Sequence, residues 1–168
     1  TQNNNSFGAS NANWNGDVSE SEINVYRTSE YNGQFGLKAI KAAEAYAVLA
    51  KNGKSIAGSG VIVGITDTGI QLDHFDLQAA TSSSSLHHYN NASEAHGTHV
   101  AGIIAATKNN SGMHGVAFQS NILSVHILGN NAPNGSPTGM KYAVDNGAKV
   151  VNASWIYVYP NTSLGVQV

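Results

Sequence analysis

The sequence predicts an α/β domain built on a doubly wound parallel β-sheet, with helices on both faces of the sheet. Two short apolar runs, at residues 61–66 and 122–128, are rich in β-branched side chains, which is typical of strands buried on both faces. A third strand is predicted at 149–154. Between them, a run of small and apolar residues from 96 to about 109 predicts a buried helix, and residues 138–145 predict a shorter one. Strands that alternate with helices indicate βαβ units and a parallel sheet.

The chain before the first predicted strand divides into two parts. Residues 1–30 are rich in Asn and Ser and have no hydrophobic period, so we expect an extended arm there. From Tyr31 to Ala50, apolar side chains recur at helical spacing, and Asn52-Gly53 supplies a stop signal. The pattern therefore predicts one helix that leads into the sheet.

Polar segments separate the later elements. Residues 78–95 include four consecutive serines, and residues 129–137 are rich in Gly, Pro and Asn, so both are expected to be loops. The tail at 160–168 has no clear pattern. No further element is predicted from these segments.

The composition excludes functions that depend on strong charge or on cysteine. Charged residues make up 11% of the 168 residues and the formal net charge is −2, which excludes an electrostatic grip on nucleic acid or on an anionic membrane. The absence of cysteine excludes disulfides, thiolate metal sites and cysteine nucleophiles. No stretch reaches the ~18 apolar residues of a membrane span, and the first residues lack the features of a signal peptide.

Asp67 directly follows the first predicted strand. In a doubly wound sheet, ligands collect at the carboxyl ends of the strands, which makes this aspartate a candidate site residue. An isolated Asp-Thr-Gly is also a common turn, in which the carboxylate caps neighbouring N–H groups. The same three residues surround the catalytic aspartates of pepsin-like and retropepsin-like proteases, which would require an all-β protein. All three interpretations remain open on this motif alone.

A second motif, His96-Gly97-Thr98-His99, begins the predicted buried helix. A histidine at the start of a helix is held on one side and exposed on the other, which suits His96 to act as a general base. We expect His99 to be a buried imidazole with satisfied hydrogen bonds. A zinc site that adds His87 and His88 is a weaker alternative, because the sequence has neither a His-Glu-x-x-His pattern nor cysteine.

Four segments agree with one protein family in residues, order and spacing. They are Val61–Ile70, His74–Leu77, His96–Ala106 and Gly112–Ala117. Together they closely resemble the catalytic domain of subtilisin-like serine proteases, over about residues 31–156. The segment from Tyr31 to Ala43 is most similar to the protease passengers of Gram-negative autotransporters. The resemblance implies a subtilisin-like fold that is incomplete at its C-terminal side.

The resemblance implies an Asp-His-Ser triad that hydrolyses peptide bonds. Asp67 matches the triad aspartate and His96 the general base. In this family the serine lies in a Gly-Thr-Ser context well over a hundred residues beyond the histidine, and no serine of this chain has that context. We therefore expect the chain to hold about half of a catalytic domain and to be inactive alone.

The resemblance also indicates where a substrate binds. Asn152, Ser154 and Trp155 match the strand that pairs with a peptide substrate. Ile156 stands where the family usually has glycine two places after that serine. The isoleucine side chain is expected to obstruct or reshape the substrate cleft.

A stabilising calcium site is a further implication of the resemblance. Oxygen donors from a loop suit this hard cation. However, Tyr31 stands where relatives supply another side-chain oxygen, and an Asn-rich loop is also a common turn, so the site remains an open expectation. No organic cofactor is expected. The implied ligands are the side chains of Asp76 and Asn109 and the carbonyls of Thr107, Ser111 and Met113.

The sequence therefore predicts a subtilisin-type serine endopeptidase that acts on polypeptides and is secreted or displayed at the cell surface. Residues 1–30 form the arm, and residues 31–168 form the N-terminal portion of the peptidase domain, whose missing C-terminal part is the expected partner. A non-catalytic or split half that binds a partner chain is the alternative, motivated by Ile156 and by the missing serine motif. The aspartic protease alternative leaves the His-Gly-Thr-His segment unexplained.

Overall fold

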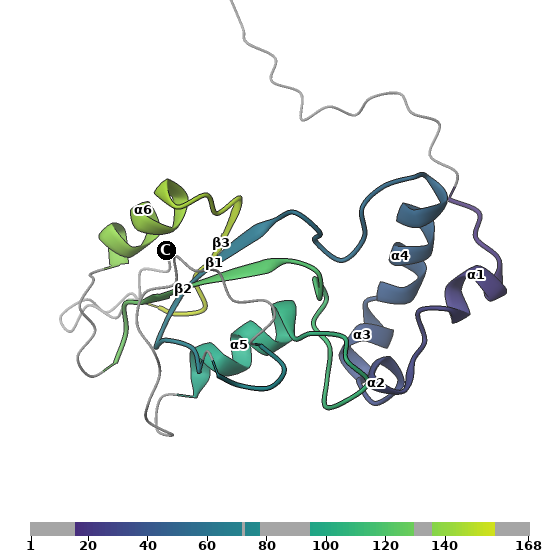
Figure 1. Ribbon diagram of the computed structural model, residues 1–168, viewed down its shortest axis with the longest axis horizontal. Helices are drawn as coiled ribbons and strands as arrows, with labels where there is room; N and C mark the ends of the chain where they lie inside the picture. Colours follow the sequence, from purple (N-terminus) through teal and green to yellow (C-terminus); the bar gives the residue numbers. More distant parts are fainter. Residues whose placement is uncertain (1–15, 72, 78–94, 130–135, 157–168) are drawn as a thin grey trace, which may run out of the picture.

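A parallel three-stranded β-sheet forms the centre of the computed structural model (Figure 1). Its strands are β1 (Ile62–Asp67), β2 (Asn121–His126) and β3 (Val150–Asn152), and β1 lies between the two later strands. The predicted parallel sheet is confirmed, although β3 is shorter than the predicted run 149–154. The structure describes residues 16–71, 73–77, 95–129 and 136–156.

Two helices cover the two faces of the sheet, and each face has its own core (Figure 1). α5 (His96–Ala105) packs against the face that includes the buried side chains of Val63 and Ile65. α6 (Ser136–Asp145) packs against the other face, which includes Leu123. Because successive side chains of a strand point to opposite faces, a strand covered on both faces needs apolar side chains on both, and β1 provides them before its last two residues. The helices on both faces confirm the predicted α/β class.

Four short helices precede the sheet: α1 (Glu20–Asn24), α2 (Ser29–Asn32), α3 (Phe35–Ala39) and α4 (Ala42–Lys51). The prediction of one continuous helix from Tyr31 to Ala50 is wrong, because the chain leaves the helical conformation at Lys41, which is left-handed with a φ of 55°. The structure also differs from the predicted extended arm. Ser19 and Glu22 form a capping box that starts α1, while residues 1–15 lie outside the described part.

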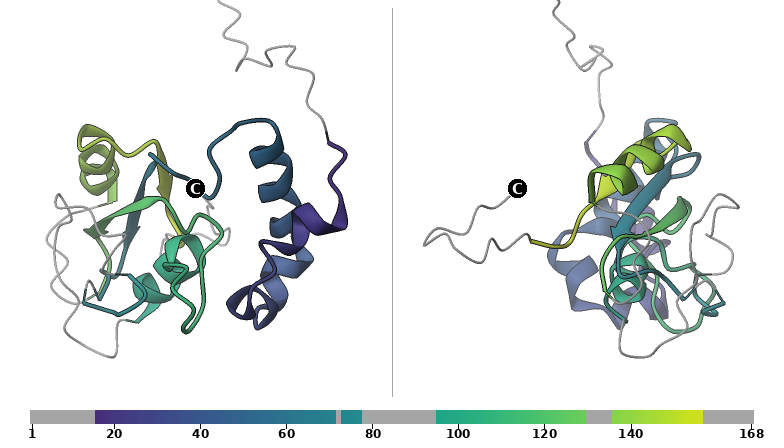
Figure 2. Two further views of the ribbon diagram at one scale, coloured as in Figure 1. Left: turned by 45° about the vertical axis from the view of Figure 1, so that its right-hand side comes forward. Right: turned by 90° about the vertical axis from the view of Figure 1, so that its left-hand side faces the viewer.

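The four helices build a core of their own beside the sheet (Figure 2). They contact the segment that joins α5 to β2: the Gln34 amide donates to the His114 carbonyl (3.2 Å), and the Tyr46 hydroxyl donates to the Val116 carbonyl (2.5 Å). Burial, with a smaller electrostatic effect of Tyr31, raises the pKa of Tyr46 to about 12. The buried apolar side chains of this core are Ile23, Tyr31, Leu37, Ala42, Ala43, Tyr46, Ala47 and Ala57.

The parallel sheet with helices on both faces excludes an all-β fold. The aspartic protease alternative required an all-β protein and is wrong, because helices flank a parallel sheet. In the described part of the chain, no helix has both the length and the apolar character needed to cross a membrane. Most of the loops predicted at 78–95 and 129–137, and the whole tail at 160–168, lie outside the described residues.

Candidate active site

Asp67 and His96 are far apart in the sequence and in direct contact in the structure. Asp67 is the last residue of β1 and its side chain is completely buried, whereas His96 is the first residue of α5 and its side chain is 54% exposed. His96 Nδ1 lies 2.8 Å from Asp67 Oδ1. The end of a central strand and the start of a helix therefore bring the two predicted triad residues together.

The helix can begin this close to the strand because residue 97 is glycine. A Cβ on Gly97 would stand 2.2 Å from the Gly69 carbonyl oxygen and 3.2 Å from Asp67 Oδ1. The Gly97 N–H also donates to the Thr68 hydroxyl (3.0 Å), which ties the first turn of α5 to the segment after β1. Any side chain at position 97 would push His96 away from Asp67.

The hydrogen bonds of the Asp67 carboxylate fix the tautomer of the His96 ring. Asp67 Oδ1 accepts from the Thr68 backbone N–H (2.7 Å) as well as from His96 Nδ1. A carboxylate only accepts hydrogen bonds, so Nδ1 carries the ring proton and Nε2 is left as an acceptor. Asp67 Oδ2 is buried without a hydrogen-bond partner among the described residues, so the carboxylate is held at Oδ1 and through its main chain.

The residues expected to bind substrate lie at the end of β3, beside β1. The Thr66 hydroxyl donates to the Asn152 carbonyl (3.0 Å), and the Trp155 indole N–H donates to the Thr66 carbonyl (2.9 Å). The exposed Ser154 hydroxyl bonds to the Asn152 amide oxygen (2.9 Å). Thr66 precedes Asp67, so the predicted substrate segment is fastened directly to the strand that carries the aspartate.

The expected calcium ligands gather where the segment after α5 passes the turn that contains Asp76. Asp76 is buried, and its Oδ1 accepts from the Asn109 side-chain amide (3.0 Å). Its carbonyl accepts from the Thr107 N–H (2.8 Å), and its Oδ2 accepts from the Met113 N–H (3.4 Å). The turn and the segment are thus joined through one aspartate.

Glu30 is a member of this cluster that the sequence did not indicate. Glu30 is 5% exposed; its Oε1 accepts from the backbone N–H groups of Asn109 (3.1 Å) and Ser111 (3.2 Å), and its Oε2 is buried without a partner among the described residues. Tyr31, which occupies the expected ligand position, instead donates its hydroxyl to the Leu37 carbonyl (3.4 Å). An acidic residue next to that position was the available signal. A buried carboxylate oxygen without a partner fits a bound cation.

The expectation for His99 is wrong, because this histidine is exposed on α5. The zinc alternative finds no support in the described ranges, where no group of three or more His, Asp or Glu side chains could hold a metal ion. His87 and His88, its other proposed ligands, lie outside those ranges. The contact that the structure gives the His96 side chain is the one with the Asp67 carboxylate.

Comparisons with known proteins identify one family. Residues 58–162 match the family model described as "Subtilase family". The chain is 33% identical over 138 residues to an extracellular serine protease of Serratia marcescens, a match that covers 77% of this chain and 12% of that protein. It is 35% identical over 125 residues to subtilisin DY of Bacillus licheniformis, which covers 71% of this chain and 43% of subtilisin DY.

A solved structure agrees in fold. Fervidolysin from Fervidobacterium pennivorans, a keratinolytic enzyme related to subtilisin, matches with a TM-score of 0.58 and 29% identity, over 83% of this chain and 22% of fervidolysin. The chain thus spans less than half the length of each of these relatives. Because more than half of its residues match the family model, including the segments that carry Asp67 and His96, the chain belongs to the subtilase family.

Proposed function

We propose that this chain carries the aspartate and histidine of the active site of a subtilisin-type serine endopeptidase. The observation that carries the proposal is the 2.8 Å contact between His96 Nδ1 and the buried Asp67 Oδ1, in a histidine whose side chain is 54% exposed. The names of the relatives, which are serine proteases, support the same reaction class. The proposed substrates are polypeptides.

Asp67 and His96 divide the work of proton transfer. His96 Nε2 takes the proton of a serine hydroxyl as the hydroxyl oxygen attacks the peptide carbonyl, and it later gives this proton to the leaving amine. Asp67 keeps the proton of the ring on Nδ1 and stabilises the imidazolium that forms. Because the Asp67 side chain is completely buried, water screens this interaction weakly.

The nucleophile is expected to come from the remainder of the peptidase domain. Within the described residues, no serine hydroxyl is hydrogen-bonded to the His96 ring, whose recorded partner is Asp67. The chain also covers only 43% of subtilisin DY. We therefore expect that the chain alone does not hydrolyse peptides, and that it becomes active together with the remainder of the domain.

An apolar groove beside α5 is the proposed contact surface for that remainder. The exposed side chains of Phe35, Ile40, Ile103 and Val116 line this groove, whose volume is about 600 Å³. Ile103 follows His96 by two helical turns, so both lie on one stripe of α5. A segment that brings a hydroxyl to His96 therefore passes along the same face and covers the apolar side chains, which are unfavourable in water.

The substrate is proposed to pair as an extended strand with the segment after β3. The resemblance of Asn152, Ser154 and Trp155 to the family's substrate strand supports this proposal, as does the bond from the Trp155 indole to Thr66, which holds the segment beside β1. Ile156 is 71% exposed at its end, and we expect its side chain to restrict which substrate side chains enter the cleft. The extracellular relative from Serratia supports a secreted location for the whole protein.

We propose that Ca²⁺ binds to Glu30, Asp76 and Asn109. The two carboxylates are buried beside the same segment, and neither makes an ion pair within the described residues, so a cation there offsets an otherwise uncompensated charge. The carbonyls of Thr107 and Ser111 and that of Met113 are the further ligands implied by the family resemblance. Bound Ca²⁺ supplies charge compensation, and the ligands then fasten α2 to the segment after α5.

Reaction with a fluorophosphonate tests the proposed activity in the protein made from the whole gene. In the same protein, we expect Asp67→Asn to lower kcat for peptide hydrolysis about 10⁴-fold, and His96→Ala to lower it at least as much. Lys141→Ala, which changes an exposed side chain on α6, is the control and should react like the parent. A whole protein that folds and binds peptides but never reacts would contradict the proposal and favour the non-catalytic half.

A further inference from the structure

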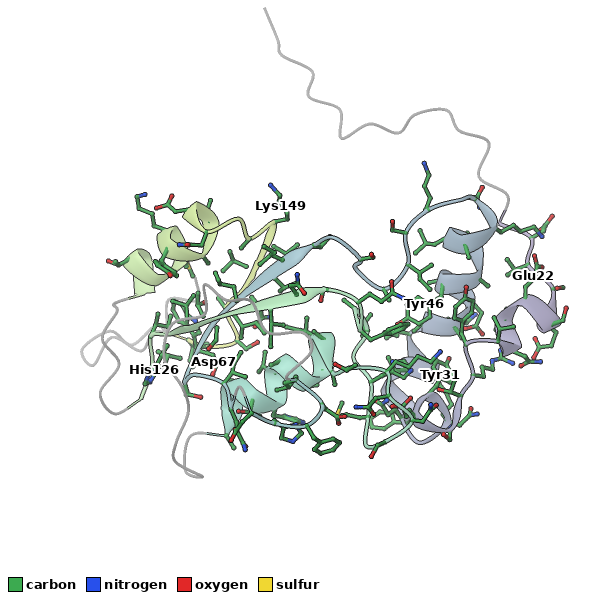
Figure 3. All side chains as sticks on the ribbon, in the orientation of Figure 1. Glu22, Tyr31, Tyr46, Asp67, His126 and Lys149 are labelled. Atoms are coloured by element: carbon green, nitrogen blue, oxygen red, sulfur yellow. The ribbon has the colours of Figure 1, made fainter. Side chains whose placement is uncertain are left out.

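His126 is the last residue of strand β2, and it lies beside Asp67 where the two strands end. The strands β1 and β2 are parallel and their register pairs Asp67 with His126, so the two side chains point to the same face of the sheet. Figure 3 labels both residues near the carboxyl ends of these strands. His126 is 8% exposed, and the proton transfer described above does not use it.

The chain directly after His126 holds the main chain of Asp67. The backbone N–H groups of Ile127 and Leu128 both donate to the Asp67 carbonyl, at 2.9 and 3.2 Å. A regular parallel ladder supplies one such bond to each carbonyl, so the second bond reflects a turn after β2. His126 Nε2 lies 2.7 Å from the Leu128 carbonyl oxygen and donates to it, because a carbonyl only accepts. The imidazole therefore closes this turn.

The His126 ring also packs against the turn that follows Asp67. A Cβ on Gly69 would stand 3.6 Å from His126 Cγ, and Gly69 has a φ of 91°, which favours glycine. The Gly69 carbonyl in turn is the group that approaches Gly97 at the start of α5. The ring thus supports one side of the turn whose other side carries the helix of His96.

We propose that His126 is a positioning residue for Asp67. Asp67 Oδ2 has no partner among the described residues, so the carboxylate depends on Oδ1 and on the main chain that the His126 turn holds. By holding Asp67, His126 keeps Oδ1 directed at His96 Nδ1 and favours the tautomer with the proton on that nitrogen. The effect of His126 on catalysis rests on the proposed function, whereas its effect on the position of Asp67 does not.

The tautomer of His96 tests the proposal in the whole protein, because its measurement needs no reaction at the nucleophile. Two-dimensional ¹H–¹⁵N spectra of the neutral rings give the ratio of the Nδ1–H to the Nε2–H form. His126→Leu removes the donor to Leu128, and we expect it to lower this ratio for His96 about tenfold. His126→Gln keeps a side-chain N–H donor and should restore the ratio to within about threefold of the parent.

Ile122→Val is the matched control, since Ile122 lies in the same strand and belongs to the core on the α5 face. It should lower the thermal stability and leave the His96 ratio unchanged. An unchanged ratio in His126→Leu overturns the proposal, and so does an equal fall in Ile122→Val.

If His126→Leu does not fold, His126→Asn replaces it, because the shorter amide cannot reach Leu128. Equal ratios in the Asn and Gln variants then overturn the proposal. A ratio that shifts as expected, in a whole protein that never reacts with fluorophosphonate, would contradict the proposed function and leave the positioning role intact.

Discussion

The sheet with its two helices and the group of four N-terminal helices are stabilised in different ways. In the sheet, β1 is enclosed between α5 and α6, and Ile65 and Thr66 are completely buried. The N-terminal helices pack around a separate core, and the side chains of that core come from no strand. Their attachment depends on polar and aromatic contacts with the segment after α5, such as those of Glu30 and Tyr46. The packing of apolar side chains therefore stabilises the sheet, whereas directed polar contacts largely attach the N-terminal helices to the segment after α5.

This difference separates the two proposed sites. The contact between Asp67 and His96 is set by steric fit at the edge of the sheet, whereas the calcium cluster joins the N-terminal helices to that unit through Glu30. Substitutions in the sheet should change the free energy of unfolding through packing, by an amount that does not depend on metal ions or salt. Substitutions at the junction should respond to metal, pH and salt.

The largest effect is expected at Gly97. Gly97→Ala places a methyl group against the Gly69 carbonyl, where the backbone cannot yield, and should lower the free energy of unfolding by about 3 kcal/mol or more. Gly36→Ala is the matched change in α3, where a Cβ meets nothing within 4 Å, and should stabilise by about 0.5–1 kcal/mol. Urea denaturation measures both. Equal effects at the two positions would remove the distinction between the regions.

The next effect concerns metal at the junction. Saturating Ca²⁺ should stabilise the parent by about 2–3 kcal/mol, because the ion compensates two buried carboxylates, and Glu30→Gln and Asp76→Asn should each remove most of this gain. Thermal denaturation with CaCl₂ or a chelator measures it. Glu44→Gln is the control, since Glu44 pairs with Arg27 instead. A parent whose Tm ignores Ca²⁺ would contradict the calcium proposal and leave the triad proposal untouched.

A pH-dependent effect is expected at Tyr46. Its pKa is raised to about 12 by burial, from an ordinary value of 10.0, so the folded state favours the neutral phenol. That contribution is complete below pH 10 and is lost as the pH rises to about 12, with a size of about 2 kcal/mol. Tyr46→Phe should therefore cost about 1 kcal/mol at pH 8, through the lost bond to Val116. Near pH 12 the variant should be about 1 kcal/mol more stable than the parent, because only the parent has lost the contribution of about 2 kcal/mol. A constant difference in urea midpoints between those pH values would contradict this.

The smallest effect is expected at Arg27. Its guanidinium pairs with Glu20 of α1 and, at 3.1 Å, with Glu44 of α4, and these partners help to raise its pKa against the opposing effect of desolvation. Because the pairs lie near the surface, Arg27→Gln should lower the urea midpoint only slightly at low salt. Adding about 1 M NaCl should remove most of the difference. A loss that is independent of salt would mean that packing, and not charge, joins α1 to α4.

Much of the sheet and of the candidate site could be predicted from the sequence because both depend on local patterns. An apolar run followed by Asp67, and a His-Gly-Thr-His motif at a helix start, identify a strand end and a helix start, and a parallel sheet brings such ends to one edge. The distance between Asp67 and His96 was not available, because it depends on how closely Gly97 lets the helix approach the Gly69 turn.

The breaks among the N-terminal helices could not be predicted from the residue pattern. Residues 31–50 have helical periodicity and good helix formers throughout, and the left-handed Lys41 is neither glycine nor asparagine, the residues that usually mark such a position. The change of direction there carries Leu37 and Tyr46 into one core. Tertiary packing outweighed a local preference.

The sequence alone determined the α/β class and the strand and helix that carry the proposed triad pair, because periodicity is a property of neighbouring residues. The family resemblance, also a property of the sequence, supplied the proposed roles of Asp67 and His96. Only the tertiary structure placed Glu30 in the proposed calcium cluster and His126 beside the turn that follows Asp67. Glu30 meets Asn109 and Ser111 across about eighty residues of chain, and His126 meets Asp67 through strand register. Contacts of this kind arise when the sheet and the helices pack, so no local pattern records them.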